Sequence, residues 1–312
     1  MTAVPVHAIL QQAYDLLKSG ELEQAKKELE SLLQQDLENE DVIYALTGVN
    51  FWADKLKKAH QSSTAFEKGE YMVSQWKPFT DFMKKLGQEK EPVLYALKQC
   101  AFTIALRFYQ SLYREDGSSR DPEICRKTGL CYKALGNYEQ ALTLLEQARD
   151  TNRESPAILA ELADCYALCG ESRMSKVLFR EAFFLGAGDI ELHFLESDII
   201  KRLLAQVHSL GYSGAAQMEW VPVYGLLYGV FNVKRELRAL EFGKLKQAIF
   251  ALENDIKTAS PESRSNLIPR LINHYFWLID HYINVNDDKA RINEVLLKIK
   301  LLDTEVYNRY TL

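Results

Sequence analysis

The chain has 312 residues, of which 47% are hydrophobic and 26% charged, an ordinary composition for a soluble globular protein. Its net charge of −5 gives no whole-chain reason to expect a nucleic-acid partner. No window reaches about 18 uninterrupted apolar residues, so we expect no membrane span.

Residues 6–39 predict a first helical hairpin. Its turn is marked by Gly20, because glycine adopts the left-handed conformation at a helix end at little cost. Small and apolar residues recur at helical spacing on both sides of this turn, which indicates two amphipathic helices: Ala13, Leu16, Leu22, Ala25, Leu29 and Leu32.

Residues 41–121 predict degenerate or extended helical hairpins. We expect two long helices within 41–87, with Pro78 near a helix start or a kink. The aromatic residues Trp76, Phe79 and Phe82 are expected in the core, with an exposed docking patch as the alternative. The mixed charge run 54–58 is expected to be a solvated face rather than a basic docking patch. A long helix over 92–114 and a polar turn over 115–120 complete this region.

Residues 122–155 and 156–189 are two copies of one unit, related by a shift of 34 residues. The shift aligns small with small and aromatic with aromatic residues, as in Gly129 with Ala163 and Tyr132 with Tyr166. A constant interval of this length is typical of stacked helix–turn–helix repeats. We therefore expect each copy to form two helices joined at Gly136 or Gly170.

Residues 190–312 match no repeat and predict a C-terminal helical block. We expect helices over 189–208, 236–258, 267–284 and 287–307, with Ser260-Pro261 as a helix start and 215–233 as the least regular stretch. A solenoid needs a capping element with a polar outer face, and this block could supply it.

The two tandem copies and residues 6–39 resemble the tetratricopeptide repeat (TPR). The resemblance rests on the small-x-x-aromatic pair, the glycine turn and the later apolar–Ala pair, as in Leu145 and Ala148. It implies an all-α solenoid of helical hairpins wound as a right-handed superhelix. The segment 42–52, VIYALTGVNFW, also has a likeness to spirochaete TPR proteins linked to the flagellar collar.

By this resemblance, the first helix of each repeat lines a concave groove that binds a protein or peptide partner. The chain is then expected to be a non-enzymatic scaffold or adaptor. The candidate groove residues are Leu10, Tyr14, Leu17 and Lys18 in the first copy, Glu123, Arg126, Lys127, Leu130 and Lys133 in the second, and Ala157, Ala160, Glu161, Asp164 and Leu168 in the third.

Arg126, Lys127 and Lys133 form a basic cluster that would suit a negatively charged partner segment. The alternative is that these cations pair with neighbouring acids or solvent. The family's clamp for the carboxylate tail of heat-shock chaperones uses Lys and Asn, and the corresponding positions include Leu10 and Leu130 here. We therefore predict no binding of an acidic chaperone tail peptide.

Other functions have weaker sequence support. The alternative to a scaffold is a regulatory protein that binds a small ligand among the aromatic residues of 220–231 and 275–282. Cys165 and Cys169, or His274, Asp280 and His281, could hold a metal, but neither set has a recognisable ligand pattern, so we expect no metal and no cofactor. No phosphate-binding loop, HExxH or GxSxG motif is present, and we expect no enzyme activity.

The start of the sequence, MTAVPVHAIL, lacks the basic region and apolar run of a signal peptide. The odd number of cysteines, five, favours a reducing compartment over a disulfide framework. We expect a cytoplasmic protein, and the sequence leaves homo-oligomerisation open.

Overall fold

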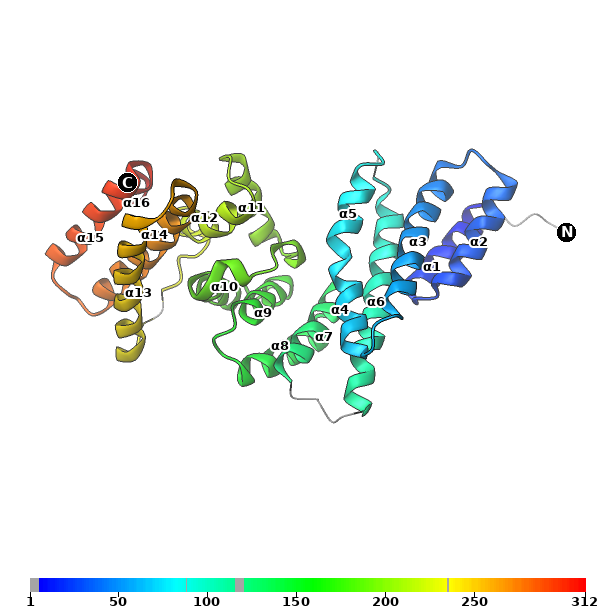
Figure 1. Cartoon of the computed structure of the whole chain (residues 1–312), viewed down its shortest axis with the longest axis horizontal. Coiled ribbons are helices and arrows are strands. Elements are labelled where there is room, and N and C mark those ends of the chain that lie inside the picture. The colour runs from blue at the N-terminus through cyan, green and yellow to red at the C-terminus, as the bar shows by residue number, and fades with distance from the viewer. Residues whose placement is uncertain (1–5, 88, 116–120, 235) are drawn as a thin grey trace. The chain divides into compact units, whose positions relative to one another are not determined.

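The computed structural model describes residues 6–87, 89–115, 121–234 and 236–312 (Figure 1). Every regular element in this described part is a helix, which confirms the prediction of an all-α helical-repeat protein. The chain divides into two compact units, Met1–Thr151 and Asn152–Leu312. The expected polar turn falls mostly on residues 116–120, outside the described residues.

In the first unit the longest helix, α6 (Glu91–Glu115), contacts both the first hairpin and later helices. Its helices are α1 (Val6–Lys18), α2 (Leu22–Gln35), α3 (Glu40–Ala59), α4 (Ala65–Ser74), α5 (Trp76–Lys84), α6 (Glu91–Glu115), α7 (Pro122–Ala134) and α8 (Tyr138–Thr151). Helix α6 packs against α4, α7 and also α1. The Thr103 hydroxyl donates to the Lys18 carbonyl at 3.3 Å, and the Arg107 guanidinium donates to the Ser19 carbonyl at 2.7 Å. The first hairpin is thus fixed to a helix far along the chain.

Residues 41–87 form three helices, so the expectation of two long helices is wrong. Helix α3 ends at Ala59, and α4 starts with a capping box, in which Thr64 and Glu67 satisfy each other's backbone N–H groups. Pro78 lies in the first turn of α5, a position where a missing N–H group costs little.

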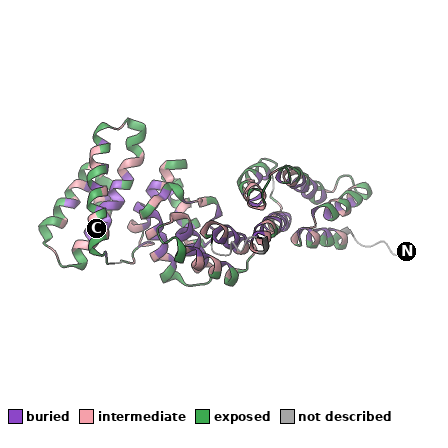
Figure 2. Cartoon of the chain, turned by 60° about the horizontal axis from the view of Figure 1, so that its bottom comes forward, coloured by how far each residue is buried: buried purple, intermediate pink, exposed green. Residues whose placement is uncertain are grey.

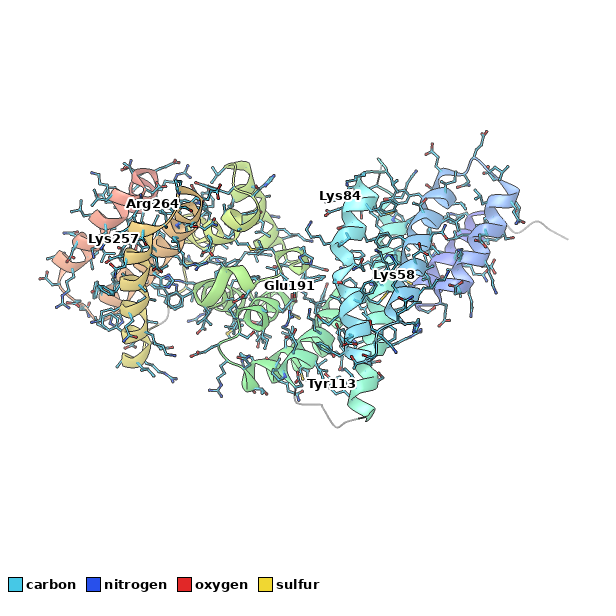
Figure 3. The ribbon with its side chains drawn as sticks, in the orientation of Figure 1. Lys58, Lys84, Tyr113, Glu191, Lys257 and Arg264 are labelled. Atoms are coloured by element: carbon cyan, nitrogen blue, oxygen red, sulfur yellow. The ribbon has the colours of Figure 1, made fainter. Side chains whose placement is uncertain are left out.

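Of the aromatic residues that we expect in the core, Phe79 is fully buried and Trp76 is partly buried, whereas Phe82 is 36% exposed. The Phe79 ring lies 5.2 Å from the ring of Trp52, which is also fully buried. The charge run 54–58 includes Asp54, Lys57 and Lys58, all exposed, and Figure 3 shows Lys58 on the surface of α3. The run is thus exposed, and a solvated face rather than a docking patch stays a prediction.

The second and third hairpins have the predicted helices and turns. The third hairpin consists of α9 (Pro156–Leu168) and α10 (Ser172–Gly186) in the second unit. At Gly136 the backbone φ is +81°, and the Asn137 N–H donates to the Tyr132 carbonyl at 2.9 Å. The third hairpin has the same helix end: Gly170 has a φ of +85°, and the Glu171 N–H donates to the Tyr166 carbonyl at 2.8 Å. These are paired glycine C-caps that satisfy the last carbonyls of a helix.

Small residues allow the paired helices of the second hairpin to approach closely. A Cβ added to Gly129 would lie 2.9 Å from Leu145 Cγ, and Ala141 and Ala148 are fully buried. The equivalent Ala163, Phe179 and Ala182 of the third hairpin are also fully buried. Figure 2 shows helices that are buried along one side and exposed along the other. The repeat pattern therefore reflects packing between paired helices.

The remaining helices of the second unit follow without another repeat. They are η1 (Ala187–Asp189), η2 (Leu192–Phe194), α11 (Asp198–Ser209), α12 (Gly214–Leu227), α13 (Ala239–Thr258), α14 (Pro261–Asn284), α15 (Lys289–Leu302) and α16 (Thr304–Thr311). Helix α14 is central, since it packs against α12, α13 and α15. Ser260 caps its start by accepting the Ser263 N–H, as the Ser-Pro signal predicts.

Three sequence expectations are wrong in this unit. Residues 189–208 are two short 3-10 turns followed by α11, not one helix. Residues 215–233, expected to be the least regular, lie mostly in α12, which continues through Pro222. The last predicted helix is broken at Asp303, whose carboxylate caps α16 by accepting the Val306 N–H at 2.9 Å.

Candidate partner-binding surface

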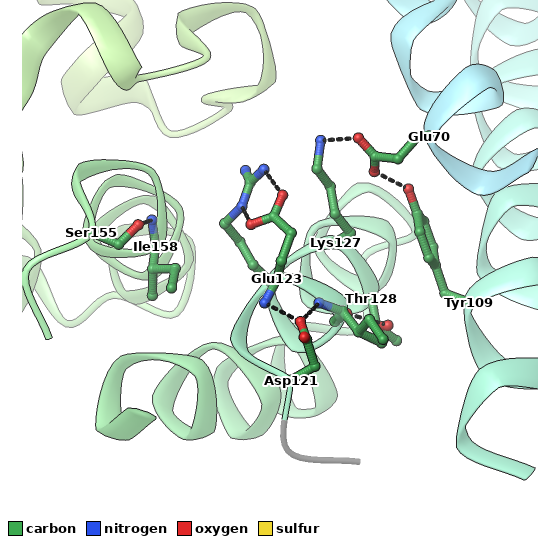
Figure 4. Close-up of polar contacts among 10 residues, drawn as sticks. Glu70, Tyr109, Asp121, Glu123, Lys127, Thr128, Ser155 and Ile158 are labelled. Atoms are coloured by element: carbon green, nitrogen blue, oxygen red, sulfur yellow. Dashed lines mark hydrogen bonds and ion pairs between the residues drawn. The ribbon is translucent and has the colours of Figure 1, made fainter. Parts of the chain in front are cut away.

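Helix α7 carries five of the predicted partner-binding residues. The helix starts after Asp121, whose carboxylate accepts the N–H groups of Glu123 and Ile124 at 2.9 and 3.0 Å (Figure 4). Pro122 at the first position needs no hydrogen-bond partner. This cap fixes the direction of the helix and therefore of the side chains on its face.

The basic cluster on α7 is buried rather than solvent-facing. Arg126 and Lys127 are each 5% exposed and Lys133 only 1%, as is the neighbouring Leu130. A buried cation keeps its charge only where acids or hydrogen-bond acceptors surround it. The expectation of an open basic patch therefore needs correction.

Lys127 is paired with an acid from an earlier helix. Its ammonium lies 3.0 Å from Oε2 of Glu70 on α4, and the Tyr109 hydroxyl of α6 donates to Oε1 of the same carboxylate (Figure 4). Burial and the adjacent Glu70 carboxylate raise the pKa of Tyr109, which keeps this hydroxyl a donor. Three helices are thus joined by one carboxylate.

Arg126 is paired within its own helix. Its Nε and Nη2 donate to the two carboxylate oxygens of Glu123 at 2.9 and 2.6 Å. The arginine side chain is 6% exposed, whereas that of Glu123 is 46% exposed. For Arg126 and Lys127, pairing with neighbouring acids is what the structure shows, and the carboxylates are the more exposed members of these pairs.

The predicted residues of α1 lie mostly inside the first unit. Leu10, Tyr14 and Leu17 are buried, and burial raises the pKa of Tyr14 to about 12. Lys18 is partly exposed and lies 2.8 Å from the Asp15 carboxylate.

The predicted residues of α9 include two buried acids. Glu161 is 2% exposed and Asp164 is fully buried, as is the neighbouring Ala160 at 1%. Asp164 accepts the backbone N–H groups of Glu196 and Ser197, both at 2.8 Å, and so fixes the segment before α11. Leu168 and Ala157 are partly exposed.

Most of the predicted groove positions are therefore interior, and four of them are partly exposed. The partly exposed positions are Lys18, Glu123, Ala157 and Leu168. Glu70 was missed, because its pairing with Lys127 joins helices that are distant in sequence and no local pattern marks it. Whether any of these residues contacts a partner stays a prediction.

The aromatic stretches of the C-terminal block fill its interior. Trp220 stacks on Tyr212 with ring centres 4.8 Å apart, and Phe276 stacks on Tyr310 at 4.8 Å. Tyr275 is buried as well, and its hydroxyl donates to Glu253 at 2.6 Å. A small-ligand site built from these rings stays a prediction, but the rings already pack on one another.

A buried ion pair joins α10 to α14. Arg180 donates to the Asp280 carboxylate and, at 3.0 Å, to the Val233 carbonyl, and its guanidinium lies over the Trp277 ring. Lys234 approaches the other oxygen of Asp280 at 2.8 Å. Asp280 is thus engaged by two cations, which explains its burial without a metal. Among the described residues, no group of three or more His, Cys, Asp or Glu side chains is arranged to hold a metal ion.

The helices of the described part also include none with the length and apolar character needed to cross a membrane. A comparison with curated proteins finds no match. No finding supports the likeness of residues 42–52 to spirochaete collar proteins. A family model described as "Tetratricopeptide repeat" does match residues 132–176, from the end of α7 to the start of α10, and this match supports the resemblance inferred from the residue spacing.

Proposed function

We propose that this protein is a non-enzymatic scaffold that binds a protein or peptide partner through the first helices of its TPR hairpins. A TPR is generally a protein-interaction module, and the match at 132–176 covers parts of both clear copies. The observation that supports a binding face most directly is the pair of partly exposed carboxylates at α7. The side chains of Glu123 and Glu70 are 46% and 32% exposed, whereas those of their partners Arg126 and Lys127 are each 6% exposed.

The ion pairs of Arg126 and Lys127 hold the acids on this surface in place, and a rigid surface favours binding of a partner. Glu123 is held by Arg126 and Glu70 by Lys127, so both partly exposed carboxylates have fixed orientations. A preorganised surface loses little side-chain entropy on binding. The partner segment we propose for this face is polar or basic, since the exposed groups are the acids.

Photo-crosslinking from single positions tests the proposal. A benzoylphenylalanine placed at Glu123 or at Leu168, each partly exposed, should form a discrete crosslinked species with a protein in native cell extract. The same group at Lys27, exposed on α2, is the control. The proposal is rejected if the three positions give the same products, or if Glu123 and Leu168 give none.

A further inference from the structure

The second unit contains a trough along α13 that lies outside the TPR hairpins. One cavity of ≈ 530 Å³ is lined by Phe184, Leu237, Leu245 and His274, and a second of ≈ 440 Å³ is lined by Phe184, Leu252 and again His274. The two also share Leu185 and Ala248, so they adjoin. Both volumes fall in the range of ligand-binding pockets.

The lining follows one face of α13 over most of its length. The contributing residues recur at spacings of three and four, which places them on one side of a helix: Glu241, Lys244, Leu245, Ala248, Ala251, Leu252 and Asp255. At about 1.5 Å per residue, the segment from Glu241 to Asp255 is about 21 Å long. An extended peptide of about six residues has this length, so the shape suits a chain-like ligand better than a compact metabolite.

The floor of the trough offers apolar surface and one defined acceptor. The Phe184 ring, partly exposed, lies 4.9 Å from the His274 ring and 4.5 Å from the Trp277 ring. His274 Nδ1 lies 2.8 Å from the Arg270 carbonyl, which can only accept, so Nδ1 carries the proton of the neutral ring. The remaining nitrogen, Nε2, is then an acceptor for a hydroxyl or N–H group.

The two ends of the trough differ in charge. Three cations and three acids line the first cavity: Arg153, Arg238, Lys244, Glu154, Glu181 and Glu241. The second cavity is lined by Asp189, Glu219 and Asp255 with a single cation, Arg270, which is paired with Glu219. The end near Asp255 therefore has an excess of negative charge and suits a positively charged group.

We propose that this α13 trough binds a partner peptide segment with an apolar or aromatic residue over Phe184 and His274 and a Lys or Arg beside Asp189 and Asp255. The inference rests on the proposed scaffold function and adds a second, separate contact site to it. An aromatic residue with a donor, tryptophan or tyrosine, would satisfy both the apolar surface and Nε2.

Peptide selection followed by a matched pair of variants tests the inference. Phage-displayed random 12-residue peptides are selected on the full chain, and the enriched sequences are synthesised with a fluorescent label for anisotropy titration. Ala251→Arg fills the trough at an exposed position, whereas Phe250→Arg puts the same side chain on the neighbouring exposed residue outside the lining. Ala251→Arg should weaken binding at least tenfold, and Phe250→Arg less than twofold.

The charge preference has its own test. Asp255→Lys should weaken the selected peptides at least threefold, and replacing their Lys or Arg by Ala should remove that difference. The inference is overturned if no peptide is enriched, if the peptides lack a basic residue, or if Ala251→Arg leaves the affinity unchanged. Peptides that respond to Glu123→Lys on α7 but not to Ala251→Arg would leave the scaffold function standing and reject the α13 trough alone.

Discussion

The ammonium of Lys127 lies 3.0 Å from a carboxylate oxygen of Glu70, and this contact joins α7 to α4 inside the first unit. The Lys127 side chain is 6% exposed, and the other oxygen of Glu70 accepts the Tyr109 hydroxyl. Helix α7, which the sequence alone predicts to be a basic docking face, is therefore paired with an acid of an earlier helix.

Removing the charge of Glu70 should destabilise the first unit. Glu70→Gln leaves the buried ammonium without its carboxylate, and we expect a loss of about 1–3 kcal/mol in the free energy of unfolding. Lys127→Met in the Glu70→Gln background should recover part of this loss, because the buried cation is removed with its partner. Urea unfolding of the single and double variants measures the coupling; strictly additive losses would contradict the pairing.

The second unit has a more deeply buried pair to test. Arg180 and Asp280 side chains are 5% and 4% exposed, so Asp280→Asn leaves a buried guanidinium uncompensated. We expect a loss of about 3–5 kcal/mol in the free energy of unfolding. Arg202→Gln is the control, since Arg202 and Asp198 form an exposed pair with 81% and 86% of their side chains accessible. Equal unfolding midpoints for the two variants would show that the buried pair is not needed.

The helical hairpins could be predicted because their causes are local. Gly20, Gly136 and Gly170 all adopt positive φ at the ends of first helices, as their positions in the repeat indicate. The start of α4 was missed, although Thr64 and Glu67 have the spacing of a capping box.

The missed elements depend on contacts that sequence spacing does not show. Residues 189–208 have helical periodicity, yet the Asp164 carboxylate of α9 binds the N–H groups of Glu196 and Ser197 and keeps them out of a helix. Residues 215–233 were expected to be the least regular stretch, but α12 continues through Pro222 within the packed interior of the unit. The burial of Lys127 likewise depends on Glu70, which no local motif identifies.

Replacing Gly136 and Gly243 by alanine should change the stability of the protein in opposite directions. Gly136 has φ of +81°, so Gly136→Ala should cost about 1–2 kcal/mol although nothing lies within 4 Å of the added Cβ. Gly243 lies within α13 with equally open space and no positive φ, so Gly243→Ala should stabilise the protein by about 0.5–1 kcal/mol. Thermal unfolding of both variants measures the difference, and shifts of the same sign would contradict the assigned conformations.

Stability of the second unit should fall in acid because of His274. Burial and the nearby Arg270 lower the pKa of His274 from 6.5 to about 4, so the unfolded chain binds more protons between these values. The free energy of unfolding then rises with pH: this contribution is complete above about pH 6.5 and is lost as the pH falls to about 4, on the order of 3 kcal/mol. His274→Gln should flatten the stability curve between pH 7 and 4 relative to the unmodified protein, measured by urea unfolding at each pH. His208→Gln, which changes an exposed histidine, should leave the curve parallel to that of the unmodified protein. A parallel curve for His274→Gln as well would show that His274 is not the group that titrates.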